Sequence, residues 1–244
     1  MHTVVSYGIA LMRKVQQPNG HNKYEFLFIK KRSTYAFITF VKGIYSKNSD
    51  NEVIKLLDNM TVEEKLCILS MNFSSIWYSS YLKMPRQMSA KEISKYETCK
   101  SKFEKKFLMD NGAKLARLIS SSSSVNYIWE MPKGMKNRHE SDYNAALREF
   151  TEETCIEKSK YRILWDEPKF EYKFVDENVE YRYIYIPAIM LDPRYKPSVY
   201  LGGHSSLETS DIKFMTAEDM LLISGNKNLF NFLNAIKKKI KKHA

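Results

Sequence analysis

With 244 residues, 43% of them hydrophobic, the chain is long and apolar enough to fold around a core, and no apolar run approaches the roughly 20 residues of a membrane-spanning helix. Its three scattered cysteines and five scattered histidines argue against a disulfide framework and a zinc site, and the N-terminus lacks a signal-peptide pattern, so we expect a cytoplasmic protein. The formal net charge of +11 suits a polyanionic partner, although a solvated lysine-rich surface would give the same value.

Strands and then helices are expected along the first half of the chain. Two strands, Thr3–Met12 and Tyr24–Lys31, carry short apolar runs, and from residue 33 to residue 124 the pattern becomes helical. Capping boxes, in which a hydroxyl and a carboxylate three residues later bind each other's backbone amides, predict helix starts at Thr61 and Ser89. Because a structureless loop of this length would be improbable in a compact domain, we expect the helical segment to fold in its own right.

Strands return in the second half, after a serine run at 120–124 that we expect to be a flexible exit. The expected elements are strands at 127–131, 161–175 with an interruption, 179–191 and 212–215, a helix at Asp142–Thr154 and a last helix from about Asn226. The sequence therefore predicts an α+β protein. Its predicted domains are an N-terminal part at 1–33, an inserted helical domain at 34–124 and the rest of the first domain at 125–244.

The predicted helix at Asp142–Thr154 carries a dense acidic cluster. Glu149, Glu152 and Glu153 stand at positions i, i+3 and i+4, so their carboxylates share one face of the helix. Arg148 lies four residues before Glu152 and can brace that carboxylate. Packed carboxylates repel one another, which is tolerable on a solvated helix and useful where a hard cation such as Mg²⁺ binds.

The wider spacing resembles the Nudix box, in which a glycine, a glutamate and an Arg-Glu-apolar-x-Glu-Glu core stand at fixed distances. Residues 134–156 match it in register at Gly134, Glu140, Arg148, Glu149, Phe150, Glu152, Glu153 and Ile156. One position departs, because Cys155 stands where the family has the glycine that ends the helix. Glycine suits a left-handed backbone there, so Cys155 puts the exit geometry of the helix in question.

The resemblance implies an α/β/α sandwich and hydrolysis of a phosphate–phosphate bond with Mg²⁺ or Mn²⁺ as cofactor. The implied site residues are the cation ligands Gly134, Glu149, Glu152 and Glu153 and the supporting residues Glu140 and Arg148. Lys133, just before the box, would meet a phosphate, unless it is a solvated loop lysine. Glu208 resembles a further carboxylate that serves as general base or extra ligand, and an ordinary loop glutamate is the alternative.

Weaker motifs outside the box resemble the mRNA-decapping Nudix proteins of large DNA viruses over nearly the whole chain. They include Lys31-Arg32, Asn59-Met60-Thr61, Ile76-Trp77-Tyr78 and Asp110-Asn111-Gly112. This resemblance implies that capped mRNA is cleaved to methylated GDP and 5′-monophosphate RNA. Because aromatic faces hold a cationic base well, the candidates for binding the methylated guanine are Trp165, Tyr172, Phe174, Tyr181, Tyr183 and Tyr185.

The helix predicted from Ser89 offers a surface for the RNA body. By helical spacing, one side carries Ile93, Tyr96, Phe103 and Phe107, and the opposite side carries Lys91, Lys95, Lys102, Lys105 and Lys106. Such a basic stripe would follow a phosphate backbone, although lysines on a helix are as often merely solvated.

Two other functions remain open from the sequence. The alternative enzyme is a Nudix hydrolase of diphosphoinositol polyphosphates or other small nucleotide polyphosphates, whose basic groove would bind a compact polyanion. The alternative without catalysis is an RNA-binding protein with a silent Nudix site, against which the full set of box carboxylates argues. The oligomeric state, with a homodimer as one option, is also open.

Overall fold

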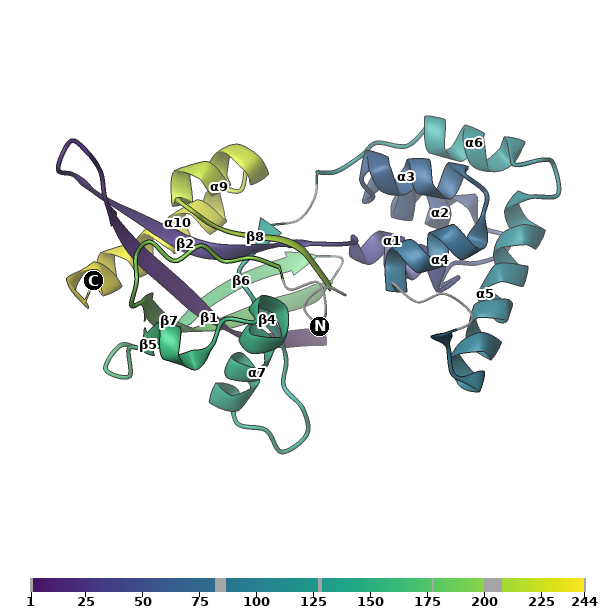
Figure 1. Cartoon of the computed structure of the whole chain (residues 1–244). Helices are drawn as coiled ribbons and strands as arrows, with labels where there is room; N and C mark the ends of the chain where they lie inside the picture. The colour runs from purple at the N-terminus through teal and green to yellow at the C-terminus, as the bar shows by residue number, and fades with distance from the viewer. Residues whose placement is uncertain (1, 82–86, 127–128, 177, 200–207, 244) are drawn as a thin grey trace. The chain divides into compact units, whose positions relative to one another are not determined.

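The computed structural model describes residues 2–81, 87–126, 129–176, 178–199 and 208–243, and the chain divides into two compact units (Figure 1). We call Met1–Lys31 together with Trp129–Ala244 the sheet unit, and Arg32–Ile128 the helical unit. Each unit has its own buried hydrophobic core. Among the described helices, none has both the length and the apolar character to cross a membrane.

The sheet unit is built on a mixed sheet. Its strands are β1 (His2–Gln16), β2 (Asn22–Lys31), β3 (Trp129–Glu130), β4 (Lys133–Met135), β5 (Tyr161–Ile163), β6 (Phe170–Asp176), β7 (Val179–Met190) and β8 (Thr209–Met215). The main order is β3-β2-β1-β7-β5, with β4 paired to β1, β6 to β7 and β8 to β2. The pairing of β1 with β7 is parallel, whereas β1 pairs antiparallel with β2 and β4 through different parts of its length.

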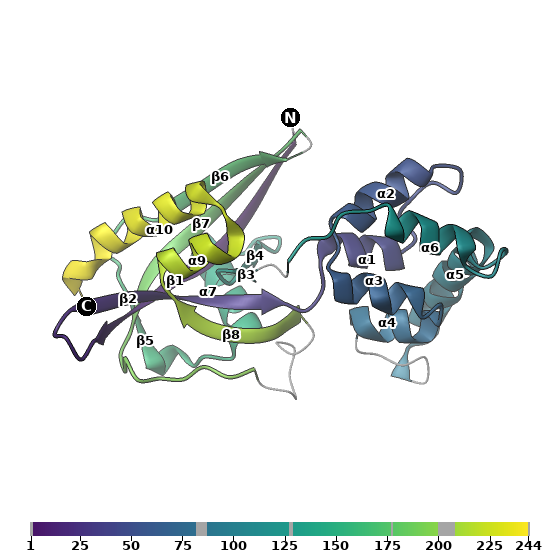
Figure 2. The same ribbon diagram turned by 90° about the horizontal axis from the view of Figure 1, so that it is seen from above.

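Helices cover both faces of this sheet (Figure 2). Alternate residues of a strand point to opposite faces, so Ile9 of β1 packs toward α7 (Asp142–Thr154) while its neighbour Ala10 packs toward α9 (Ala217–Ser224) and α10 (Lys227–Ile240). The resulting three layers confirm the predicted α+β class and the sandwich with a helical segment between β2 and β3.

Several boundaries differ from the prediction. The strand expected at 127–131 is described as only Trp129–Glu130, and residues 127 and 128 lie outside the described part. The interruption expected within the strand at 161–175 is confirmed, because residues 164–169 separate β5 from β6. Helix α9 and the short strand β4 that leads into the box are not among the elements expected from the sequence.

The helical unit consists of short helices around an aromatic core. They are α1 (Tyr35–Val41), α2 (Asp50–Asp58), α3 (Val62–Leu69), α4 (Phe73–Tyr81), α5 (Ala90–Phe107) and α6 (Ala113–Ser120). Both predicted capping boxes are present, at Thr61 and Ser89. The Phe40 and Phe107 rings stack at 5.6 Å, which joins α1 to the end of α5.

The serine run that leaves α6 is held by hydrogen bonds, so the expectation of a flexible exit is wrong. The ammonium of Lys65 donates to Ser122 Oγ at 2.7 Å, and the Ser123 amide donates to Asp58 at 2.8 Å. Short hydroxyl side chains next to buried charged groups are good local partners, which composition alone does not reveal.

Candidate active site

The helix α7 presents its acidic residues because its other side is buried. Ser141 caps its start by accepting a hydrogen bond from the Asn144 amide, and Phe150 is buried in the core beneath the helix. The helix ends at Cys155, whose φ of 52° lies in the left-handed region. Cys155 therefore adopts the conformation for which the family uses glycine, and the exit geometry of the helix is retained.

Arg148 organises the exposed carboxylates. Its Nε and Nη2 donate to the two oxygens of Glu140, each at 3.0 Å, which is a bidentate ion pair. Its Nη1 donates to Glu149 at 2.7 Å and to Glu152 at 3.1 Å. The guanidinium of Arg148 lowers the pKa of the Glu140 carboxyl. The arginine thus holds Glu149 and Glu152 side by side and itself rests on Glu140.

Glu149 packs directly against the backbone of Gly134 in β4. A Cβ atom added at Gly134 would lie 2.1 to 2.4 Å from the carboxylate atoms of Glu149, so no other residue fits without displacing that side chain. Burial raises the pKa of Glu149, although Arg148 opposes the shift. The glycine of the box is therefore needed here for close approach rather than for a positive φ.

Glu153 differs from its two neighbours because it is buried. It is 4% exposed, accepts a hydrogen bond from Lys31 Nζ at 2.5 Å and accepts a second from the Lys133 amide at 2.9 Å. Burial raises the pKa of Glu153 to about 7, against the opposing influence of Lys31.

Lys31 and Glu130 belong to the same cluster, although neither is among the site residues expected from the sequence. Lys31 Nζ lies 3.4 Å from Glu130, 2.5 Å from Glu153 and 3.6 Å from the exposed Glu208. Burial would raise the pKa of Glu130, but ion pairing with Lys133 and Lys31 outweighs it and the net shift is downward. The available signal was Lys31 at the end of the buried strand β2, because a charged residue is rarely buried unless it is paired.

Lys133 lies at the start of β4 with its side chain buried. Its side chain is 5% exposed, its ammonium pairs with Glu130 at 2.6 Å and it lies 4.4 Å from the centre of the Tyr183 ring. The alternative of a solvated loop lysine is therefore wrong, and a phosphate contact by Lys133 stays a prediction. Alternation along β4 turns it inward, and only its backbone amide faces the carboxylates of α7.

The aromatic candidates for a guanine site do not enclose an open cavity together. Tyr172, Tyr183 and Tyr185 line a space of only about 70 Å³, which Lys133 also lines. Phe174 and Tyr181 stack on each other at 5.0 Å on β6 and β7. Trp165 lines a different pocket of about 360 Å³.

The lysines predicted to form a basic stripe on α5 divide into two groups. Lys91, Lys95 and Lys105 are exposed. Lys102 Nζ instead donates to the carbonyls of Gly43 and Tyr45 at 2.5 and 2.6 Å. Lys106 Nζ donates to the carbonyls of Ser46, Lys47 and Ser49 and lies 3.3 Å from Asp50.

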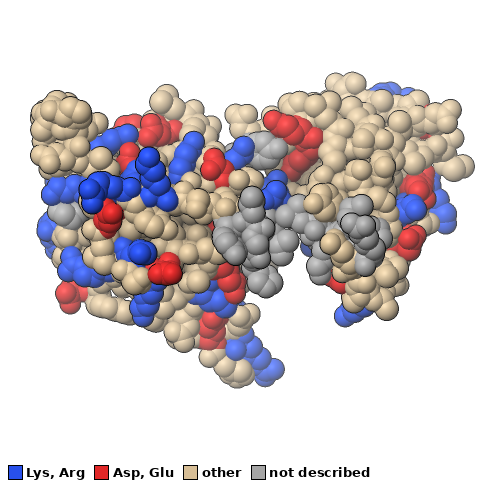
Figure 3. Space-filling model, viewed as in Figure 1, with Lys and Arg blue, Asp and Glu red and all other residues tan. Residues whose placement is uncertain are grey.

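The prediction of a single continuous basic stripe is therefore wrong, because Lys102 and Lys106 hold the loop between α1 and α2. Ile93, which was placed on the buried side, is 41% exposed. Figure 3 likewise shows acidic and basic side chains together along the edge of the helical unit where α5 lies, and many Lys and Arg side chains over the sheet unit.

The carboxylate cluster suits a hard cation chemically, since carboxylate and carbonyl oxygens are the ligands that Mg²⁺ and Mn²⁺ prefer. Glu149 and Glu152 are held side by side, and Glu149 lies against the Gly134 backbone. Within the described residues, no three acidic, histidine or cysteine side chains already stand in a metal-binding arrangement. Lys31 and Arg148 instead balance the negative charge of these carboxylates.

Comparison with known proteins decides the family. The model of the NUDIX domain matches residues 107–236. The mRNA-decapping protein g5R of an African swine fever virus isolate from a Namibian warthog is 32% identical over 235 residues, which are 94% of this chain and 92% of that protein. The chain belongs to the Nudix family. A second isolate's g5R, from a South African tick, is also 32% identical over 94% of this chain.

Nudix hydrolases generally use divalent metal ions, and α7 with its entry strand β4 is the Nudix box of this chain. Among solved structures, a complex of the C. elegans Ap4A hydrolase is similar with 15% identity, a TM-score of 0.48 and coverage of 98% of both chains.

Proposed function

We propose that this chain is a metal-dependent decapping enzyme that hydrolyses the 5′ cap of mRNA and releases methylated GDP and 5′-monophosphate RNA. The observation that carries the proposal is the Arg148-braced carboxylate cluster of α7, in a chain that aligns with mRNA-decapping proteins over 94% of its length. An RNA with a triphosphate-linked cap is a polyanion, which also suits the net charge of +11.

Oxygens of Glu149, Glu152, Glu153 and the Gly134 carbonyl would hold Mg²⁺ or Mn²⁺. When bound, the cation neutralises phosphate oxygens and makes the attacking water more acidic. Arg148 orients Glu149 and Glu152, and Glu140 fixes Arg148 in turn. Glu208 is 71% exposed beside the cluster, which suits a general base that takes the proton of the attacking water.

The exposed Lys91, Lys95 and Lys105 of α5 are proposed to contact the RNA body. Each ammonium that neutralises a phosphate would contribute to affinity in a salt-dependent way. Lys102 and Lys106 are left out of this surface, because their ammonium groups bind backbone carbonyls of their own unit.

The test is to incubate the protein with cap-labelled RNA and with free cap analogue, each with and without Mg²⁺. A decapping enzyme that uses the RNA body releases methylated GDP from the RNA only when Mg²⁺ is present, and little from the free analogue. Equal hydrolysis of the analogue and of small nucleotide polyphosphates, with capped RNA intact, would favour the small-polyphosphate hydrolase instead.

A further inference from the structure

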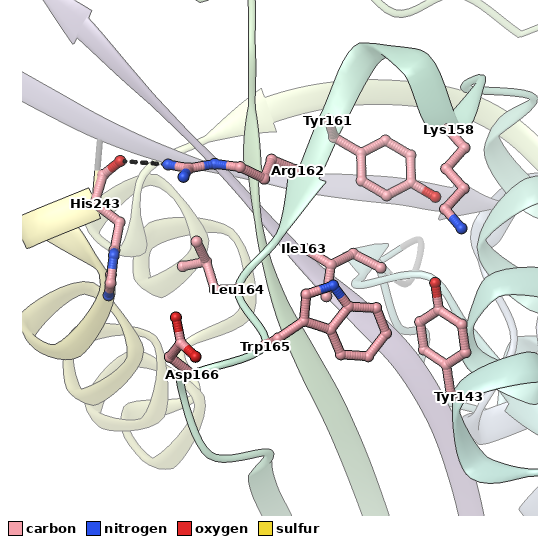
Figure 4. Close-up of a pocket in the computed structure, with 9 residues that line it drawn as sticks. All are labelled: Tyr143, Lys158, Tyr161, Arg162, Ile163, Leu164, Trp165, Asp166 and His243. Atoms are coloured by element: carbon pink, nitrogen blue, oxygen red, sulfur yellow. Dashed lines mark hydrogen bonds between the residues drawn. The ribbon is translucent and has the colours of Figure 1, made fainter.

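A pocket of about 360 Å³ opens on the sheet unit beside β5, and no box carboxylate lines it (Figure 4). Its size falls within the roughly 300–1,000 Å³ of small-ligand sites. The lining residues with chemical groups relevant to binding are Tyr143, Lys158, Tyr161, Arg162, Trp165 and Asp166. Tyr143 lies nine residues before Glu152 on α7, which places the two on opposite sides of the helix. Because Glu149, Glu152 and Glu153 are absent from the lining, the pocket is separate from the carboxylate cluster.

Two tyrosine hydroxyls in this pocket are unusual. The oxygens of Tyr143 and Tyr161 are buried, and neither has a hydrogen-bond partner among the described residues. Tyr161 as a whole is 4% exposed, and burial raises its pKa to about 12, so its hydroxyl remains a donor at neutral pH. In Figure 4 both hydroxyls point toward the part of the pocket where the Lys158 ammonium lies. A buried hydroxyl without a partner is costly, and a small side-chain shift that lets a ligand oxygen reach it would remove that cost.

One wall of the pocket is an exposed aromatic platform. Trp165 is 67% exposed, although its ring packs against Tyr143 with 4.7 Å between ring centroids. The tyrosine holds the indole in place and leaves much of it open. Lys158, itself exposed, lies 5.7 Å from the Tyr143 ring centre, so a cation stands beside the platform.

The far end of the pocket differs in character. Arg162 donates to the carbonyl of His243 at 3.3 Å, which connects the end of the chain to this wall. Asp166 is the one acid among the lining residues. The two tyrosine hydroxyls and the Lys158 ammonium therefore gather at the Tyr143 end, next to the indole, while Arg162 and Asp166 carry opposite charges at the far end.

We propose that this pocket is a second nucleotide-binding site, in which a nucleobase stacks on Trp165 and its phosphate binds Lys158 and the hydroxyls of Tyr143 and Tyr161. An exposed indole binds any base through its face, and an ammonium with two hydroxyl donors suits phosphate oxygens. The nucleotide is either free or one residue of an RNA strand. The site goes beyond the decapping reaction, because it does not use the catalytic glutamates.

The binding test is calorimetric titration of the full chain with AMP, without divalent cations so that the carboxylate cluster is not engaged. Trp165→Ala should weaken AMP binding about tenfold, in line with the contribution of a stacked base. Lys158→Ser should weaken it several-fold, whereas Lys160→Ser, an exposed lysine on the same short helical turn (Lys158–Lys160), should leave it unchanged. Ribose 5-phosphate, which lacks the base, should bind wild type about as weakly as AMP binds Trp165→Ala.

Competition by a short RNA with a 5′-hydroxyl distinguishes the two sources of the nucleotide. If the RNA competes with AMP, the site accepts a nucleotide within a strand. If the RNA does not compete, the ligand is a free nucleotide. Tyr161→Phe removes only the hydroxyl, so the variant should fold and its affinity for AMP can be measured. It should lower AMP affinity while thermal stability stays equal or rises. The proposal is overturned if wild type does not bind AMP, if Trp165→Ala and Lys158→Ser bind it like wild type, or if ribose 5-phosphate binds wild type as tightly as AMP.

Discussion

Two helices of this protein, α7 and α5, carry dense charge next to a buried apolar side, and their charged side chains have different partners. On α7, Arg148 binds Glu140, Glu149 and Glu152, so the charged groups are turned toward one another at the surface. On α5, Lys102 and Lys106 turn toward backbone carbonyls of the preceding loop, while Lys91, Lys95 and Lys105 remain exposed.

The difference shows which charged atoms can be located from the spacing of residues on a helix. A carboxylate is short, so its place on a helix nearly fixes where its oxygens lie. A lysine beside the buried side has a long flexible stem, so its ammonium can reach carbonyls well away from its own turn. Spacing therefore located the oxygens of α7 better than the ammonium groups of α5.

The largest expected effect tests the α7 side of this comparison. Glu149→Gln and Glu152→Gln should each reduce decapping by a factor on the order of 100 to 1,000, because each removes an anionic ligand of the cation that would neutralise the reacting phosphates. The fold should be retained, since glutamine keeps the volume and relieves repulsion between carboxylates. Release of methylated GDP from cap-labelled RNA measures the effect, with the exposed Glu157→Gln on the loop after α7 as control. Near-normal turnover in either variant would remove that residue from the essential ligands.

The same contrast explains how much could be predicted. The bounds of α7 and its carboxylate face followed from local spacing, since the helix spans Asp142–Thr154 as expected. Glu130 and Lys31 were missed as site residues because they join the cluster through strand pairing between β2 and β3, which is nonlocal. The burial of Lys133 was missed for a related reason, because its direction depends on the unexpected strand β4. Long-range strand pairing decides which face of the sheet such residues occupy, and this pairing cannot be read from a single sequence.

The second prediction concerns the stability of the helical unit. Lys106→Met should lower the free energy of unfolding by about 2–3 kcal/mol, because the side chain is 4% exposed and binds several loop carbonyls that would be left without this donor. Lys105→Met, one residue away and exposed, should change it by less than about 0.5 kcal/mol. Urea unfolding followed by circular dichroism measures both. If both substitutions change the free energy of unfolding by the same small amount, the carbonyl contacts of Lys106 do not stabilise the unit. The distinction between bound and exposed lysines on α5 would then be contradicted.

The third prediction asks whether the exposed lysines contact RNA. Changing Lys91, Lys95 and Lys105 together to Ser should weaken RNA binding and reduce the salt slope by up to about 2, at about 0.7 for each phosphate of a single strand. Hydrolysis of a small nucleotide in the Nudix cleft should hardly change. Lys55→Ser, an exposed lysine of α2, is the control. An unchanged affinity and slope, with circular dichroism still showing a folded unit, would make these lysines a solvated surface.

The smallest expected effect lies at the end of α7, where Cys155 replaces the glycine of the family. Its φ of 52° is unfavourable for a residue with a Cβ, so Cys155→Gly relieves strain in the folded chain while making the unfolded chain more flexible. These two effects oppose each other, and the net change in unfolding free energy should be between zero and a gain of about 1 kcal/mol. Cys155→Ala separates them, because it keeps the Cβ and its strain but removes the sulfur, and it should match wild type. If instead Cys155→Gly and Cys155→Ala both lose more than about 1 kcal/mol, the sulfur itself packs against its surroundings. The cysteine would then stabilise the exit of α7 through its side chain, and its likeness to the family glycine would be limited to the backbone.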